Sequence, residues 1–182
     1  STAIVGDNTD GSALFTTACA YGGPSNTLDD CANVNAGFTG GDVAAGASYD
    51  FGNGFTAATG LQTSNTGVLT EESLDSYGLN AAYTGSNYGL SLTYGITETS
   101  ATEENAYTAL NAYYTPEGFP SISAGYEIVD LGGEPAASDE MESFFVGLTW
   151  DEVGPGSAGV AFGYSDIVEN TDEEYMLSLI HI

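Results

Sequence analysis

The sequence Tyr88-Gly-Leu-Ser-Leu-Thr-Tyr-Gly-Ile-Thr97 places a large apolar residue at almost every second position and a small or hydroxyl-bearing residue between them. Successive side chains of a β-strand point to opposite faces of a sheet, so this pattern predicts a strand with one apolar and one small, polar face. The same period of two occurs in residues 42–51, 121–129, 143–150 and 157–166, and residues 74–84 and 106–114 are further strand-like runs. We therefore expect an all-β protein whose strands repeat these two faces.

The connections between the predicted strands alternate in length. Tight turns are expected at Gly52-Asn53-Gly54, Gly85-Ser86-Asn87, 115–118 and 151–156. Longer connections that hold most of the carboxylates are expected at 62–73, 98–105, 130–142 and 166–174. Short turns on one rim and long loops on the other are typical of an antiparallel up-and-down transmembrane β-barrel. Small residues on the polar side would leave space along its wall for water and solutes.

The number of strands points to part of a barrel rather than a whole one. We count about nine strands, the first at 13–20, plus a stub at 174–176, whereas closed bacterial barrels have an even number. We therefore interpret residues 1–176 as a partial transmembrane β-barrel domain, an incomplete segment of a larger porin barrel. Residues 177–182 resemble the translated end of a transposase sequencing adapter, so we expect an artefactual tail there and exclude it from the fold.

The composition is acidic without any compensating base. The chain of 182 residues has 26 Asp plus Glu, no Lys or Arg, and a formal net charge of -26. Such a charge repels nucleic acid and attracts cations, so we expect no nucleic-acid partner. The one His lies in the tail, and we find no catalytic triad or phosphate-binding loop. We therefore expect no enzyme activity, no catalytic residues, no cofactor and no dedicated metal site, although acidic pairs in the long loops could bind divalent cations weakly.

Aromatic residues are expected to lie at the ends of the strands. Two aromatic bands around an aliphatic zone are typical of the two water–lipid interfaces of a membrane barrel. The alternative is that Tyr and Phe simply favour strands. The predicted girdle near the tight turns consists of Phe51, Phe55, Tyr83, Tyr88, Tyr114 and Trp150.

Polar residues opposite the apolar stripe are candidates for a pore lining. Glu127 lies in mid-strand, where a charged side chain facing lipid would cost a few kcal/mol, so we expect it to face the lumen and to favour cations. The alternative is a wall residue in contact with water and without measurable effect. The other predicted pore-lining residues are Asp42, Asp50, Asn80, Asn111 and Ser123.

Cys19 and Cys31 are the two cysteines of the chain. We expect them to form a disulfide that closes a short external loop after the first strand, since the predicted barrel would form in an oxidising compartment. A bridge that closes a loop of this size could stabilise the fold by about 3 kcal/mol. The alternative is a pair of free buried thiols.

Residues 107–126 (Tyr-Thr-Ala-Leu-Asn-Ala-Tyr-Tyr-Thr-Pro-Glu-Gly-Phe-Pro-Ser-Ile-Ser-Ala-Gly-Tyr) resemble the barrel of cyanobacterial outer-membrane porins related to the carbohydrate-selective OprB group. Residues 143–160 resemble the same family. The resemblance implies a barrel of about sixteen strands behind an N-terminal S-layer homology domain. It also implies the outer membrane of a Gram-negative-type bacterium, contact with its lipid, and passage of small hydrophilic solutes and inorganic ions.

Two matters stay open at this point. The absence of Lys and Arg departs from the porin family and argues against selectivity for anions, so we expect a pore that favours cations. The oligomeric state is undetermined, with a homotrimer as one option. The main alternative function is that of a secreted, acidic, calcium-binding β-sandwich or adhesin.

Overall fold

The computed structural model describes residues 2–6, 12, 14–21, 31–32, 43–63, 75–100, 102–133, 140–167 and 174–181. In this part of the chain there is no helix with the length and apolar character that a membrane crossing requires. The described strands are β1 (Thr2–Gly6), β2 (Val43–Asp50), β3 (Phe55–Thr63), β4 (Asp75–Thr84), β5 (Tyr88–Glu98), β6 (Glu104–Tyr114), β7 (Ser121–Asp130), β8 (Glu140–Val153), β9 (Gly156–Ile167) and β10 (Glu174–His181).

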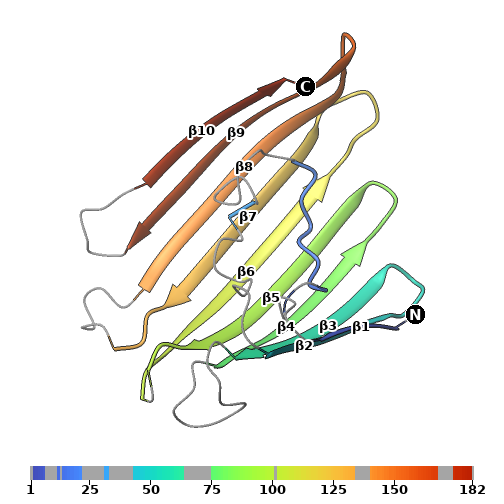
Figure 1. Ribbon diagram of the computed structural model, residues 1–182. Helices are drawn as coiled ribbons and strands as arrows, with labels where there is room; N and C mark the ends of the chain where they lie inside the picture. Colours follow the sequence, from blue (N-terminus) through green and yellow to red (C-terminus); the bar gives the residue numbers. More distant parts are fainter. Residues whose placement is uncertain are drawn as a thin grey trace.

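The ten strands form one antiparallel sheet in which each strand pairs with its neighbours in the sequence, in the order β1 to β10. The predicted all-β, antiparallel, up-and-down architecture is thereby confirmed. Figure 1 shows that the sheet curves into a trough rather than lying flat. The trough is open, because within the described residues β1 pairs only with β2 and β10 only with β9.

The two faces of the trough differ in the polarity of their side chains. Along β5, Ser91 is buried with 1% of its surface exposed, whereas the adjacent Leu92 is 48% exposed. The buried positions lie on the side toward which the sheet curves, which we call the concave face, and the exposed positions form the convex face. The convex face carries large apolar side chains, among them Leu79, Leu90, Leu92, Leu110, Ile122, Val146 and Phe162.

Glycines of the concave face accommodate aromatic rings from the next strand. Gly95 pairs with Tyr107 across β5 and β6, and a Cβ built on Gly95 would collide with the Tyr107 ring. Gly89 and Tyr113 repeat this arrangement closer to the tight turn. The expectation that small residues leave open space along this wall is therefore wrong at these two positions, because the rings occupy it.

The four connections predicted to be tight turns all lie at one end of the sheet, along the right-hand side of Figure 1. Two details differ from the prediction. β8 continues to Val153 across an irregularity in the register, so the last tight turn is shorter than 151–156. The acidic connection expected at 98–105 is reduced to 99–103, because Glu98 and Glu104 pair in the ladder between β5 and β6. The alternation in length therefore does not hold at that connection.

Both ends of the described chain also differ from the prediction. The first strand is β1, and the expected strand at 13–20 is wrong, because the described residues 14–20 belong to no ladder. Residues 177–181 pair with β9 as part of β10, so their exclusion from the fold is also wrong. The artefactual origin of residues 177–182 stays a prediction. Leu177 pairs with Phe162 of β9, and both side chains are exposed.

We predict that Gly95→Ala destabilises the fold by about 1–3 kcal/mol through overpacking against Tyr107. Urea unfolding followed by the fluorescence of Trp150, the one tryptophan, would measure it. Ala81→Val is the matched control, because it adds volume to an exposed position of β4. In a Tyr107→Leu background the cost of Gly95→Ala should shrink; an equal cost in both backgrounds would contradict the assigned contact.

Candidate functional site: a strap across the polar face

Residues 14–21 cross the concave face as an irregular segment, which we call the strap. Its alternate backbone N–H groups donate hydrogen bonds to side chains of the sheet. The amide nitrogen of Thr16 donates to Asn80 Oδ1 on β4 (2.9 Å), that of Ala18 to Ser91 Oγ on β5 (2.8 Å), and that of Ala20 to Ser123 Oγ on β7 (2.9 Å). The small polar face of the sheet thus takes the place of a partner strand.

Sheet side chains also donate to the carbonyl groups of the strap. Asn80 Nδ2 donates to the carbonyl of Thr16 (3.0 Å) and, within the sheet, to Thr93 Oγ1 (2.8 Å). The side-chain amide of Asn80 therefore both accepts a hydrogen bond from Thr16 of the strap and donates one to it. Thr149 Oγ1 on β8 donates to the carbonyl of Ala20 at 3.5 Å. The strap is therefore bonded to β4, β5, β7 and β8, and it spans the middle of the trough.

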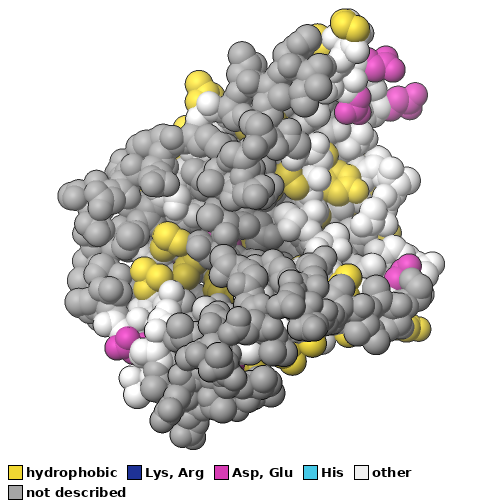
Figure 2. Space-filling model, in the orientation of Figure 1, with side chains coloured by type: hydrophobic (Ala, Val, Ile, Leu, Met, Phe, Trp, Pro, Cys, Tyr) yellow, Lys and Arg dark blue, Asp and Glu magenta, His cyan; other side chains and the backbone are white. Residues whose placement is uncertain are grey.

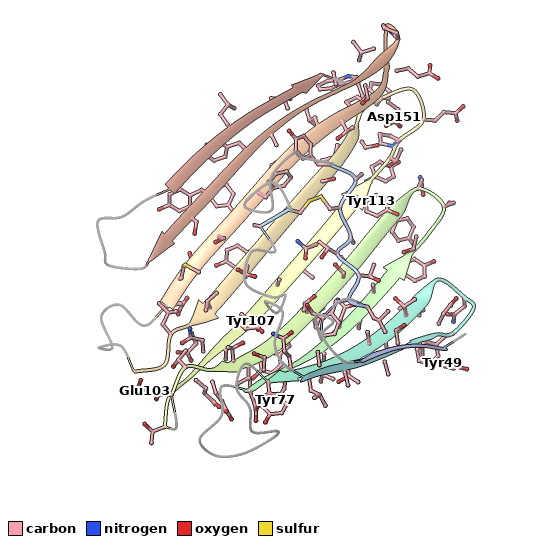
Figure 3. The ribbon with its side chains drawn as sticks, in the orientation of Figure 1. Tyr49, Tyr77, Glu103, Tyr107, Tyr113 and Asp151 are labelled. Carbon is pink, nitrogen blue, oxygen red and sulfur yellow. A yellow bond between two sulfur atoms is a disulfide. The ribbon has the colours of Figure 1, made fainter. Side chains whose placement is uncertain are left out.

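Apolar contacts fix the two ends of the strap. Tyr21 is buried, and its ring lies over Gly147 and Gly159, where Cβ atoms would come within about 3 Å of it. The centre of this ring lies 5.4 Å from that of Phe145. At the other end, Phe15 packs against the buried group of Tyr107, Ala109 and Val129. Figure 3 labels Tyr107 in the lower half of the sheet.

Cys19 of the strap is joined to Cys31 by a disulfide, with the two Cα atoms 6.1 Å apart. The expected external position of Cys31 is wrong, because Cys31 is fully buried on the concave face (0% exposed). Asn111 Nδ2 on β6 donates a hydrogen bond of 2.7 Å to the carbonyl of Cys31, which lies directly over Gly125 of β7. The disulfide therefore ties the strap to the centre of the sheet, as the yellow bond in Figure 3 shows.

The structure places the predicted pore-lining residues in three different situations. Asn80, Asn111 and Ser123 lie on the concave face, but they are buried and bonded to the strap or to Cys31. Asp50 is exposed and accepts a hydrogen bond of 2.7 Å from the amide of Gly52, so it belongs to the tight turn after β2. Asp42 lies outside the described residues.

Glu127 lies on the concave face of β7, the side on which the sequence places it, with none of its surface exposed. Its partners across the ladders are Ala109 on β6 and Ser143 on β8. The Ser143 hydroxyl donates to Ser165 Oγ at 2.9 Å. Glu127 has interactions within the protein and is fully buried, so it is not a side chain open to water.

The predicted aromatic girdle follows the tight-turn end of the convex face. Phe55 and Tyr83 lie with ring centres 4.7 Å apart, and Tyr83 and Tyr88 with ring centres 5.4 Å apart. Tyr49, which the sequence analysis did not include, extends the row with its ring centre 4.8 Å from that of Phe51. The exposed members of the predicted girdle are Phe51, Phe55, Tyr88, Tyr114 and Trp150.

A second aromatic row lies further along the same strands. Tyr77 on β4, Tyr94 on β5 and Phe144 on β8 are exposed on the convex face. Each lies six residues from an aromatic residue at the tight-turn end of its own strand, which corresponds to about 20 Å along a strand. The convex face is thus apolar between two aromatic rows.

Sequence reasoning missed several of the residues that hold the strap. Ser91 and Thr149 were predicted to lie in strands, but nothing in their local sequence distinguishes them from other hydroxyl residues of the same stripe. Tyr21 was not singled out, because it follows a segment that we interpreted as a wall strand. The glycines at 147 and 159 are the one usable signal, since they leave room for a ring.

Carboxylates in the described ranges do not gather into a metal site. No group of three or more His, Cys, Asp or Glu side chains there is arranged to hold a metal ion. Figure 3 labels Glu103 near the lower left and Asp151 near the upper right, at opposite ends of the sheet. In the view of Figure 2, most of the visible carboxylates likewise lie toward the edges of the molecule.

Comparison of the chain with protein-family models, with curated proteins and with solved structures finds no match. We therefore infer the function from the two faces of the sheet and from the strap.

We predict that Asn111→Ala destabilises the protein by about 1–3 kcal/mol, because it leaves the buried carbonyl of Cys31 without its donor. Urea unfolding under non-reducing conditions measures this change. Asn87→Ala, in the exposed turn between β4 and β5, is the matched control and should change the stability by less than about 0.5 kcal/mol. Equal effects of the two substitutions would show that the Asn111 contact contributes nothing specific.

Proposed function

We propose that this chain forms part of the wall of an outer-membrane β-barrel pore that passes small hydrophilic solutes and inorganic ions. The observation that carries the proposal is the reversed polarity of the sheet. Large apolar side chains such as Leu92 and Leu110 are each 48% exposed on the convex face, while hydroxyl and amide groups are buried on the concave face. Lipid on the outside and a polar interior account for both facts.

Exposure of the convex face to water would be costly. Burial of a single Leu or Phe side chain stabilises a protein by roughly 1.5–3 kcal/mol, and this face leaves many such side chains partly exposed. A contiguous apolar surface of this kind marks a contact with membrane or with another protein. Hydrocarbon would cover it without a second layer of chain.

The lengths of the central strands also fit a bilayer. β4 and β7 each have 10 residues, and β5 and β6 each have 11 residues. A strand that crosses the hydrocarbon core at a tilt needs about 9–11 residues. The two aromatic rows of the convex face would lie at the two water–lipid interfaces, where ring bodies are apolar and hydroxyl groups can reach water.

An open sheet edge is unfavourable in lipid, because its backbone N–H and C=O groups have no partner there. β1 and β10 each have one such edge among the described residues. The proposed pore therefore needs further strands that close the barrel. The resemblance of residues 107–126 and 143–160 to OprB-like porins supports a larger barrel and a cyanobacterial outer membrane as its location.

The proposed pore favours cations. With 26 acidic residues and no Lys or Arg, nothing in the chain offsets the negative potential of the wall. Anions would meet this potential as a barrier, whereas small cations would gather in the conduit. The proposal includes no catalytic step and no resident cofactor.

The remaining alternative is a secreted acidic β-sandwich or adhesin, in which a second sheet from elsewhere would cover the convex face. Such a protein would bury the apolar side chains against protein rather than lipid. The disulfide fits either case, since both classes are exported to oxidising compartments. The position of the convex face relative to lipid separates the two.

We predict that brominated lipids in a vesicle membrane quench the fluorescence of tryptophan residues that lie on the convex face. Trp150 lies at the tight-turn end of this face, so lipids brominated near the headgroup should quench it most. In the variant Trp150→Phe/Leu92→Trp the probe moves toward the middle of the apolar zone, and lipids brominated deep in the chain should quench it most. Trp150→Phe/Ser86→Trp, with its probe in an exposed turn, is the control for weak quenching. Absence of quenching at both Trp150 and position 92 would favour the soluble alternative.

We predict that planar bilayers containing the closed barrel, of which this chain forms part of the wall, show a reversal potential on the cation-selective side in a KCl gradient. Glu127→Gln should move this potential toward zero, because it removes a charge from the concave side. Asp130→Asn is the matched control at the exposed end of β7 and should have the smaller effect. Channels whose reversal potential is the same with and without the Glu127 charge would show that this residue has no role in selectivity.

A further inference from the structure

The strap adds a second layer of chain to the concave face, along the path that a solute would follow. It is bonded to side chains of four strands, from β4 on one side to β8 on the other. Ala18 and Tyr21 within it are buried. In a pore built on this sheet, the strap would occupy cross-section that the wall alone would leave open.

We propose that the strap is the size-limiting element of the pore, and that Ser91 and Ser123 are the positioning residues that hold it against the wall. This inference rests on the proposed function, since it assigns a role within the same conduit. The solute would meet the strap rather than the polar stripe of the sheet. The hydroxyl groups of that stripe act on the solute only indirectly, through the position of the strap.

The attachments favour a fixed constriction over a mobile plug. The amide groups of Ala18 and Ala20 have Ser91 and Ser123 as acceptors at 2.8 and 2.9 Å. Between these two residues, Cys19 is covalently joined to Cys31, whose carbonyl is held by Asn111. Polar bonds and a covalent bond thus restrain the same short stretch, so loss of either set should allow it to move from the wall.

Two pairs of serines on the same face give a matched test. The variant Ser91→Ala/Ser123→Ala removes both acceptors of the strap. The control variant Ser121→Ala/Ser143→Ala removes two buried hydroxyls that bond to Thr115, in the connection before β7, and to Ser165 on β9, not to the strap. The closed barrel of which this chain forms part of the wall is reconstituted into liposomes, and the swelling rates in glucose, sucrose and raffinose are compared.

The variant Ser91→Ala/Ser123→Ala should raise the swelling rate in raffinose relative to that in glucose by about twofold or more. The reason is that the narrowest radius of a pore controls which solutes pass. The control pair should leave this ratio unchanged. Equal ratios in the wild type and both variants would overturn the role of the strap while leaving the pore itself intact. Absence of swelling with the wild-type closed barrel would instead overturn the proposed function.

Reduction of the disulfide is a second measurement that does not depend on refolding of a variant. Dithiothreitol added to wild-type channels already inserted in a planar bilayer should raise their single-channel conductance. Channels of the Cys19→Ser/Cys31→Ser variant should show the higher conductance from the start and no response to the reductant. If neither the serine pair nor reduction changes the size limit or the conductance, the strap does not limit the pore.

Discussion

The hydrogen bonds between the strap and the side chains beneath it are the interaction on which the concave face depends. Backbone groups buried away from water need partners, and among the described residues no strand pairs with the strap to supply them. The acceptors come from Asn80, Ser91 and Ser123, which are short enough to let a chain lie close above the sheet. Longer polar side chains would hold the strap further from the sheet. The small polar residues of the concave face therefore allow the strap to lie directly on it.

Glycine and tyrosine provide the apolar counterpart of this polar layer. The rings of Tyr107 and Tyr21 lie where Gly95, Gly147 and Gly159 have no side chain. Each ring therefore packs against bare backbone, and a single added methyl group would displace it. Outside the cluster around Val129 these rings, rather than aliphatic side chains, fill the concave face, whereas Leu79, Leu92 and Val146 are exposed on the convex face. One alternation along the chain thus specifies a packed polar face and an apolar outer face together.

The sequence allowed prediction of the strands, because the period of two is a local property of the backbone. It also predicted the correct face for Asn80, Asn111, Ser123 and Glu127. The period alone does not say what an extended segment pairs with, so 14–20 was mistaken for a strand of the wall although it bonds to side chains. The same limit explains why Cys31, expected in an external loop, lies at the centre of the sheet: its position depends on contacts with residues about 80 or more positions away. The tail at 177–181 was excluded for its resemblance to an adapter, whereas β-pairing depends only on alternation and an available edge.

The absence of Lys and Arg constrains how such an interior can be built. A buried carboxylate is unfavourable without a cationic partner, and this chain has none to offer. The strap is accordingly held by neutral hydroxyl and amide groups, although carboxylates would accept stronger hydrogen bonds from the same amides. Two buried carboxylates depart from this rule. Glu127 has interactions within the protein, whereas Asp75 Oδ1 has no hydrogen-bond partner among the described residues. Neutral anchors hold the strap through hydrogen bonds that salt does not screen as it screens exposed charges.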